Sequence, residues 1–347
     1  MPKLPTAGSS VTIYDVAAAA GVSIKTVSRV LNREPNVKPG TRQMVMAAAA
    51  KLQYRPNVSA RSLAGSRSYL LGLLFDNPSR AYVSELQFGA LHCCRQEGYH
   101  LLVEAIDSTA GDVVQSVEAM LQTLKIDGLI LTPPVCDLPD VLEMLDRSST
   151  PYVRIAPEHD AARAARVNMD DRLAAYQMTE LLLGLGHRDI GFIKGHPDHG
   201  AAHLRFEGYL DALRDHGAPV RPERISQGYF SFKSGVESAE ALLGDDDRPT
   251  AIFASNDEMA LGIMSVASRR GLVIPQQLSI AGFDDSPSAK VVWPQLTTVR
   301  QPVVEMARAA AEMLIFRATR SEDGAAASRL LDFEIIARES TAALTVV

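Results

Sequence analysis

The stretch Thr12–Asn32, TIYDVAAAAGVSIKTVSRVLN, decides how the N-terminal part of the chain folds. Four consecutive alanines, residues 17–20, predict a helix of small side chains. Gly21 then permits a tight turn, because glycine adopts positive φ without steric cost. Ser23 is a favourable N-cap for a second helix over residues 24–31. The stretch therefore predicts two short helices joined by a glycine turn.

The apolar side chains of the second helix indicate how it packs. Val27, Val30 and Leu31 recur at i, i+3 and i+4, so they would face the first helix. A small residue at Ala17, a turn glycine and an inward valine have the spacing of a helix-turn-helix. The alternative is an ordinary helical hairpin with a solvated polar face. The outward face, which could meet the edges of bases in a major groove, carries Ile24, Lys25, Thr26, Ser28 and Arg29.

The residues that follow favour the DNA-binding reading. A third helix is predicted over residues 43–52, with Thr41 as its N-cap, and YRPN and ARSLAG come after it. The segments TIYDVA, AGVS, TVSRVLN, YRPN and ARSLAG stand in order between residues 11 and 65. This run resembles the headpiece of the lactose-repressor (LacI/GalR) family of bacterial transcription regulators.

The resemblance implies a DNA-binding set and a hinge. Residues 57–64 would form a hinge helix that folds when two subunits sit on an operator, and the segment is too short to be stable alone. Leu63 would enter the minor groove and kink the duplex; the alternative is a core leucine of a short helix. The implied DNA-binding residues are Thr12, Tyr14, Ser23, Ile24, Lys25, Thr26, Ser28, Arg29, Asn32, Asn57, Ala60 and Leu63.

The distribution of charge agrees with one DNA-binding end. The 347-residue chain carries a formal charge of −6, yet residues 1–67 contain ten Lys/Arg against Asp15 and Glu34, a charge of +8. The remaining residues therefore carry −14. A basic head on an acidic body confines phosphate attraction to one end and argues against nonspecific coating of nucleic acid.

Composition also bounds the compartment. Cys93, Cys94 and Cys136 have no C-x-x-C spacing and suit free thiols in a reducing environment. No apolar run reaches the length of a membrane span, and the N-terminus lacks the apolar core of a signal peptide. We therefore expect a cytoplasmic protein with no membrane partner.

From residue 69 onward, strand patterns alternate with helix patterns, which predicts parallel sheets with right-handed crossovers. The number of units, about ten, favours two similar α/β lobes. Strands are expected at 69–75, 100–104, 128–131, 152–155, 189–193, 251–254 and 278–283. Helices are expected at 82–97, 112–124, 139–146, 172–185, 204–216, 237–243, 258–269 and 303–317.

The resemblance extends over this region and implies the fold class: an all-α helix-turn-helix headpiece plus a two-lobed, periplasmic-binding-protein-like α/β core of parallel, doubly wound sheets. The chain would cross between the lobes near residues 166, 300 and 328. The expected domains are the headpiece at 1–55, the hinge helix and linker at 56–68, and an effector-binding and dimerisation core at 69–347, with a first lobe at 69–166 and 301–327 and a second at 167–300 and 328–347.

Ligands of doubly wound sheets bind at the carboxyl ends of the strands, so polar residues after each strand are candidates for an effector site. Carboxylates, amides and a guanidinium can hydrogen-bond adjacent sugar hydroxyls, while a ring stacks on the sugar. With the resemblance, this gives Asp76, Asn77, Arg205, Phe230, Asn256 and Asp284. Asn256 could instead be only a helix cap, and Arg205 could only pair with a surface acid.

The remaining candidate residues and motifs are weaker evidence for a site. Tyr82 and His203 are further candidates for lining the cleft. His196, His199 and His203 share one loop, but we expect solvated side chains there rather than a metal site. No cofactor is expected, and no nucleophile–base or phosphate-binding motif suggests an enzyme.

The sequence thus predicts a homodimeric repressor of carbohydrate-utilisation genes that binds a near-palindromic double-stranded operator and is released by a sugar or glycoside. Dimerisation follows from the resemblance, because the chain lacks the leucine-heptad tail that makes tetramers in the family. Two alternatives stay open: a corepressor-dependent regulator that binds a nucleobase or other metabolite, and a plain sugar-binding receptor.

Overall fold

The computed structural model describes residues 11–31, 37–54, 67–244, 247–321 and 324–344. The chain divides into two compact units, Met1–Tyr69 and Leu70–Val347, each with its own core. Within the described ranges, none of the helices combines the length and the apolar character needed to span a bilayer.

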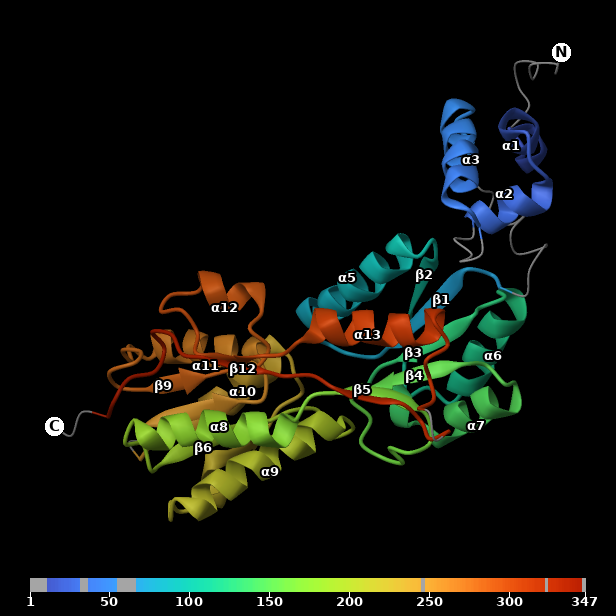
Figure 1. The fold of residues 1–347 in the computed structure, drawn as a ribbon. Coiled ribbons are helices and arrows are strands. Elements are labelled where there is room, and N and C mark those ends of the chain that lie inside the picture. Colours follow the sequence, from blue (N-terminus) through green and yellow to red (C-terminus); the bar gives the residue numbers. More distant parts are fainter. Residues whose placement is uncertain (1–10, 32–36, 55–66, 245–246, 322–323, 345–347) are drawn as a thin grey trace. The chain divides into compact units, whose positions relative to one another are not determined.

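The described residues of the N-terminal unit form three helices (Figure 1). They are α1 (Ile13–Ala20), α2 (Ile24–Leu31) and α3 (Pro39–Lys51). Gly21 ends α1 with φ of 64°, the left-handed conformation for which glycine is suited. The predicted turn and the bounds of the second helix are confirmed.

Two helix starts differ from expectation. Helix α1 begins before the alanines, because the backbone N and Oγ1 of Thr12 both donate to Oδ2 of Asp15 at 2.8 Å and close its first turn. The predicted N-cap at Thr41 is wrong: α3 already begins at Pro39. Proline suits the first turn of a helix, where its missing N–H would have no intrahelical acceptor.

A small apolar core holds the three helices together. Val27 and Val30 are buried on the inner face of α2, as predicted. Burial of a valine side chain contributes about 1.5–3 kcal/mol. The core members are Val16, Ala17, Val27, Val30, Val45, Ala48 and Ala49.

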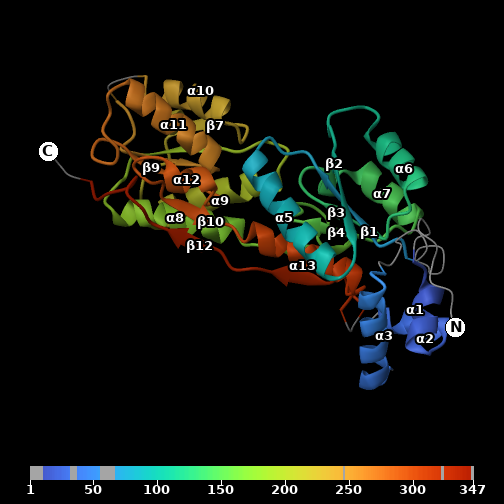
Figure 2. The ribbon, with the colours of Figure 1, turned by 90° about the horizontal axis from the view of Figure 1, so that it is seen from above.

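The C-terminal unit contains two parallel sheets with helices on both faces of each (Figures 1 and 2). We call the first sheet and its helices the first lobe. Its strands, in sheet order, are β11 (Ser328–Leu330), β5 (Ala165–Asn168), β4 (Tyr152–Ile155), β3 (Gly128–Leu131), β1 (Leu70–Phe75) and β2 (His100–Ala105). Helices α5 (Arg80–Gln96) and α13 (Val303–Ile315) cover one face, and α6 (Val113–Thr123) and α7 (Pro139–Arg147) cover the other.

The second sheet and its helices form the second lobe. Its strands, in sheet order, are β7 (Ile225–Gln227), β6 (Ile190–Lys194), β8 (Ala251–Ala254) and β9 (Ser279–Ala281). Helices α8 (Asp171–Gly184) and α9 (Gly200–Asp215) pack together, as do α10 (Phe232–Leu242) and α11 (Asp257–Arg269). The second lobe also has two short helices, η2 (Pro222–Arg224) and α12 (Pro287–Val291), and the first lobe has one, η1 (Val135–Asp137).

Three segments connect the two lobes, and two of them pair with each other. Strand β10 (Thr298–Arg300) runs antiparallel to β12 (Glu334–Ile336). The expected lobe boundary near residue 328 differs from the structure, because β11 hydrogen-bonds to β5 in the first sheet. This pairing satisfies backbone groups at the sheet edge and moves the last crossing beyond Leu330.

Both sheets reverse their strand order at one point. Strand β1 lies between β2 and β3, and β6 lies between β7 and β8. In open α/β sheets, the connections on either side of such a strand leave in opposite directions and open a crevice at the carboxyl ends. The fold thus provides each lobe with one place where a ligand can enter.

Candidate functional site

In the N-terminal unit, one face of α2 is open to solvent. The buried Val27 and Val30 fix the rotation of the helix, so Ile24, Lys25 and Arg29 point outward. Ile24 is 40% exposed, although it is a large apolar residue. The ammonium of Lys25 and the guanidinium of Arg29 can bind phosphates, and the aliphatic side chain of Ile24 can contact thymine methyls.

The other predicted DNA-binding residues occupy different positions around this face. Thr12 and Tyr14 are exposed at the start of α1, and Tyr14 is 67% exposed. Ser23 caps α2 by accepting from the backbone N of Thr26 at 3.1 Å, as predicted. Ser28 is half-buried. Four further predicted residues, Asn32, Asn57, Ala60 and Leu63, lie outside the described residues.

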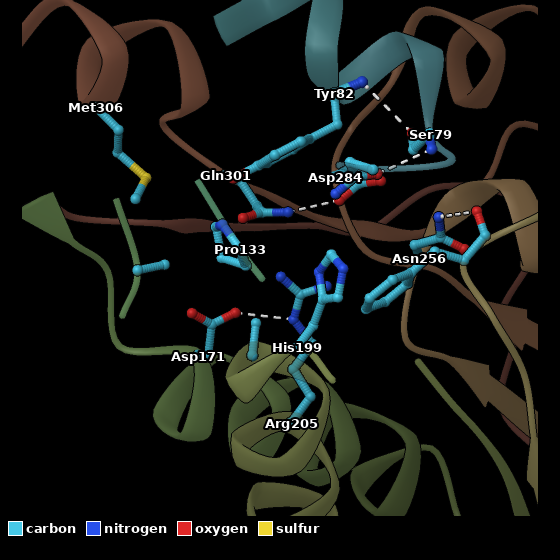
Figure 3. A pocket seen from close by; sticks show the side chains of 14 residues that line it. Ser79, Tyr82, Pro133, Asp171, His199, Arg205, Asn256, Asp284, Gln301 and Met306 are labelled. Atoms are coloured by element: carbon cyan, nitrogen blue, oxygen red, sulfur yellow. Dashed lines mark hydrogen bonds and ion pairs between the residues drawn. The ribbon is translucent and has the colours of Figure 1, made fainter. Parts of the chain in front are cut away.

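The C-terminal unit has a pocket at the carboxyl ends of strands from both sheets (Figure 3). It encloses about 480 Å³ of empty space, part of it open to solvent. Its lining residues are Asn77, Ser79, Tyr82, Pro133, Ala156, Asp171, His199, Ala201, Arg205, Phe230, Asn256, Asp284, Gln301 and Met306.

The pocket gathers most of the predicted effector residues. They are Asn77, Arg205, Phe230, Asn256 and Asp284. Asp76 is not among the lining residues. Its Oδ2 accepts from the backbone N and Oγ of Ser108 at 2.9 and 2.6 Å, so this carboxylate holds the loop after β2 against the end of β1.

Arg205 is held by an internal ion pair. Its Nε donates to Oδ1 of Asp171 at 2.8 Å and its Nη1 to the carbonyl of Ser255 at 2.6 Å. Both side chains are almost fully buried. The guanidinium also lies 3.6 Å from the ring centroid of Phe283. The partner is thus a buried acid rather than the surface acid considered above, and the guanidinium is fixed at the pocket wall.

Asp284 occupies a strained and poorly compensated position. Its φ of 133° is unusual for a residue with a side chain. Gln301 donates to its Oδ1 at 2.5 Å. Burial raises the pKa of Asp284 well above its ordinary value, and the nearby carboxylate of Asp257 adds to the rise. A ligand that donates a hydrogen bond to this group would stabilise its charged form.

Asn256 has a structural role that positions a ring. Its Oδ1 caps α11 by accepting from the backbone N of Met259 at 3.0 Å. Its Nδ2 donates to the carbonyl of Phe230, also at 3.0 Å. Phe230 has φ of 57° and is only 5% exposed. The helix-cap alternative for Asn256 is therefore what the structure contains, although the side chain also borders the pocket.

The histidine expectation is wrong for His199. This residue is 4% exposed and lines the pocket, where its ring lies near those of His196 and Phe230. Burial lowers the pKa of His199 to about 4, so the ring is neutral at physiological pH. His203 is exposed and outside the lining, with Nδ1 2.7 Å from Oε1 of Glu158.

Sequence reasoning also missed Asp171, Gln301 and Met306. Asp171 follows the first crossing between the lobes. Gln301 and Met306 both follow the second crossing, at β10. Only their positions in the sequence could have indicated a role in the site, because segments that connect two lobes border the cleft between them. Tyr82, which was a weaker candidate, does line the pocket, and burial raises the pKa of its hydroxyl.

The pocket offers both kinds of hydrogen-bonding group: Arg205 and Tyr82 can donate, while Asp284 and His199 can accept. Within the described ranges, no group of three His, Cys, Asp or Glu side chains is placed to hold a metal ion.

Comparison with known proteins finds two matching families. "Bacterial regulatory proteins, lacI family" matches residues 12–57, and "Periplasmic binding protein-like domain" matches residues 179–341. Catabolite control protein A of Priestia megaterium is 36% identical over 307 residues, which cover 88% of this chain and 92% of the relative.

Solved structures of similar proteins extend over almost the whole chain. The lac repressor dimer bound to operator and the anti-inducer ONPF has a TM-score of 0.77 at 27% identity, covering 96% of this chain and 100% of that one. The complex of the transcriptional regulator CelR with cellobiose has a TM-score of 0.71 at 28% identity, covering 95% and 99%.

Proposed function

Because the chain belongs to the lacI family of bacterial regulatory proteins, we propose that it represses its target genes as a homodimer whose affinity for an operator is set by a small effector, a sugar or glycoside. The protein is a DNA-binding transcription regulator. The observation that carries the effector half is the pocket that joins polar side chains from both lobes.

On DNA, α2 is the recognition helix in this proposal. Ile24 and Arg29 reach the major groove. Lys25, Thr12 and Tyr14 contact the phosphate backbone beside it. The hinge residues Asn57, Ala60 and Leu63 remain part of the proposed interface. Two headpieces of a dimer read half-sites about one helical turn apart, which requires a near-palindromic operator.

The effector controls operator binding by contacting both lobes at once. Asn77 and Tyr82 belong to the first lobe, and Arg205 and Asp284 to the second. A ligand that bridges these groups favours one arrangement of the lobes over another. Such coupling between two sites is on the order of 1–3 kcal/mol, or about 5–150-fold in operator affinity.

Two further parts of the proposal follow from this role. We propose a regulator without catalytic activity, since the pocket residues form a hydrogen-bonding network around a guanidinium. We also propose that it acts in the cytoplasm, where a bacterial operator is accessible.

Selection from genomic fragments with the purified protein tests the proposal. We expect a near-palindromic site that is released on adding a sugar. A site bound only in the presence of a metabolite would make the effector a corepressor. A plain sugar-binding receptor would recover no specific site, which would overturn the regulator assignment.

A further inference from the structure

Among the side chains that line the pocket are one guanidinium, two carboxylates and one buried histidine. We infer that the pocket selects uncharged polyhydroxylated effectors and excludes anionic ones such as sugar phosphates and uronates. The inference rests on the proposed function, because it specifies the effector of the same site.

The guanidinium of Arg205 is already neutralised by the protein. Asp171 accepts its Nε–H at 2.8 Å, and both groups are at most 5% exposed. The backbone carbonyl of Ser255 accepts a second hydrogen bond, from Nη1 of Arg205. In the described part of the chain, no residue accepts from Nη2, so this edge is open to a neutral oxygen. A bound phosphate would need the positive charge of Arg205 to offset its own burial, and Asp171 already neutralises that charge.

Acids of the protein also lie at the starts of three helices of the second lobe. A helix N-terminus attracts anions through its unpaired N–H groups and its dipole. Asp171 lies in the first turn of α8, and Asp257 in the first turn of α11. Glu158 packs on Gly200 at the start of α9, where its Oε1 also contacts His203. The first turns of α8 and α11 thus carry acids of the protein, and the side chain of Glu158 lies against the start of α9.

In the described part of the chain, two acids near Arg205 make hydrogen bonds but no direct ion pair. Asp284 accepts from Gln301, and Asp257 accepts from Oγ1 of Thr298 at 2.6 Å. Burial raises the pKa of both, which is the response of acids that lack a positive partner. Burial keeps His199 neutral, so it offsets none of this charge. An incoming anion would therefore meet no positive charge here and could bind only with these two acids held protonated, while a hydroxyl can donate to Asp284.

The groups left open match hydroxyls. Each hydroxyl of a polyol both donates and accepts, and the pocket offers donors at Arg205 and Tyr82 beside acceptors at Asp284 and His199. Met306 and Pro133 supply apolar surface for the C–H groups of a sugar ring. Phe230, at 5% exposure, leaves little ring surface for stacking a planar base.

Isothermal titration of the purified full chain with matched compounds tests the inference. The pairs are D-glucose with D-glucose 6-phosphate and D-glucuronate, D-ribose with D-ribose 5-phosphate, and cellobiose with cellobionate. We expect at least one uncharged member to bind saturably and its anionic partner to bind about 100-fold more weakly or not at all, since burying a charge without a partner of opposite sign is costly.

A matched pair of variants separates charge from shape. Asp284→Asn keeps the size and removes the carboxylate, so the preference for the uncharged compound should shrink roughly tenfold. Asp332→Asn, at an exposed site, should leave the ratio unchanged. The inference is overturned if an anion binds as tightly as its parent, or if no uncharged compound binds. Operator binding by the same preparations is measured separately and fails only if the regulator assignment is wrong.

Discussion

The ring of Phe230 lies directly against the Cα of Gly195. A Cβ added at residue 195 would stand 2.1 Å from Cζ of that ring and 2.3 Å from Cε1. Phe230 cannot easily move away, because Asn256 holds its carbonyl and its backbone is already in the left-handed region. The absence of a side chain after β6 therefore sets the position of one wall of the pocket.

Gly195→Ala should destabilise the C-terminal unit by about 1–3 kcal/mol, because overpacking forces a buried ring out of its rotamer. Urea unfolding measures this, and effector titration should show weakened binding. Gly184→Ala is the matched control, since no atom lies within 4 Å of its added Cβ. Equal behaviour of the two variants would mean that the contact between Gly195 and Phe230 does not constrain the pocket.

Arg205→Met should cost about 3–5 kcal/mol of unfolding free energy, because Asp171 would be left buried without its partner. Adding Asp171→Leu should recover most of this loss by removing the unpaired charge. Arg269→Met, which breaks an exposed pair with Glu240, is the control and should change little. A double variant no more stable than Arg205→Met alone would show that the ion pair is not what Arg205 contributes.

The free energy of unfolding should depend on pH through Asp257. Burial raises its pKa to about 7, so the native state binds the proton more tightly than the unfolded chain. This contribution is complete below about pH 4 and is lost as the pH rises through 7. His199 has the opposite sign, because its lowered pKa makes stability increase between about pH 4 and 6.5.

Asp257→Asn should therefore flatten the fall in stability between pH 6.5 and 7.5, where the opposing contribution of His199 is fading. Asp284 keeps part of the dependence, since burial raises its pKa as well. Urea unfolding at several pH values gives the slope. An unchanged slope in the variant would rule out Asp257 as its source.

The apolar strands were predictable from the sequence, and the short polar ones were not. Strands β3, β4 and β8 are buried along their whole length, and their bounds agree with expectation. Strands β5 and β11 were missed, because β5 alternates buried and half-buried residues and β11 is exposed. Their pairing depends on backbone groups far apart in the chain, which leave no local hydrophobic pattern.

The site was predictable where a strand-end rule applied. Asn77 and Asp284 follow strands directly and line the pocket. Asp76 follows the same strand as Asn77, but its partner Ser108 comes 32 residues later and draws it away. The burial of His199 depends on Phe230 and His196 packing around it, so no spacing in its own loop reveals it.

Lys25→Ala should weaken operator binding uniformly across sequences and lower the slope of log affinity against log salt by about 1, if the lysine neutralises one phosphate. Lys51→Ala, at the end of α3, is the control and should keep the slope. Fluorescence anisotropy on the selected operator at several salt concentrations measures both. A loss confined to one base position would instead make Lys25 a base-reading residue.

Selection of genomic fragments with the purified protein, followed by titration of uncharged sugars against the recovered site, tests the central claim most directly. The account predicts a near-palindromic site that the dimer binds and that one uncharged sugar releases, with Asp284→Asn binding the same site but responding less. Failure to recover any specific site would contradict the account.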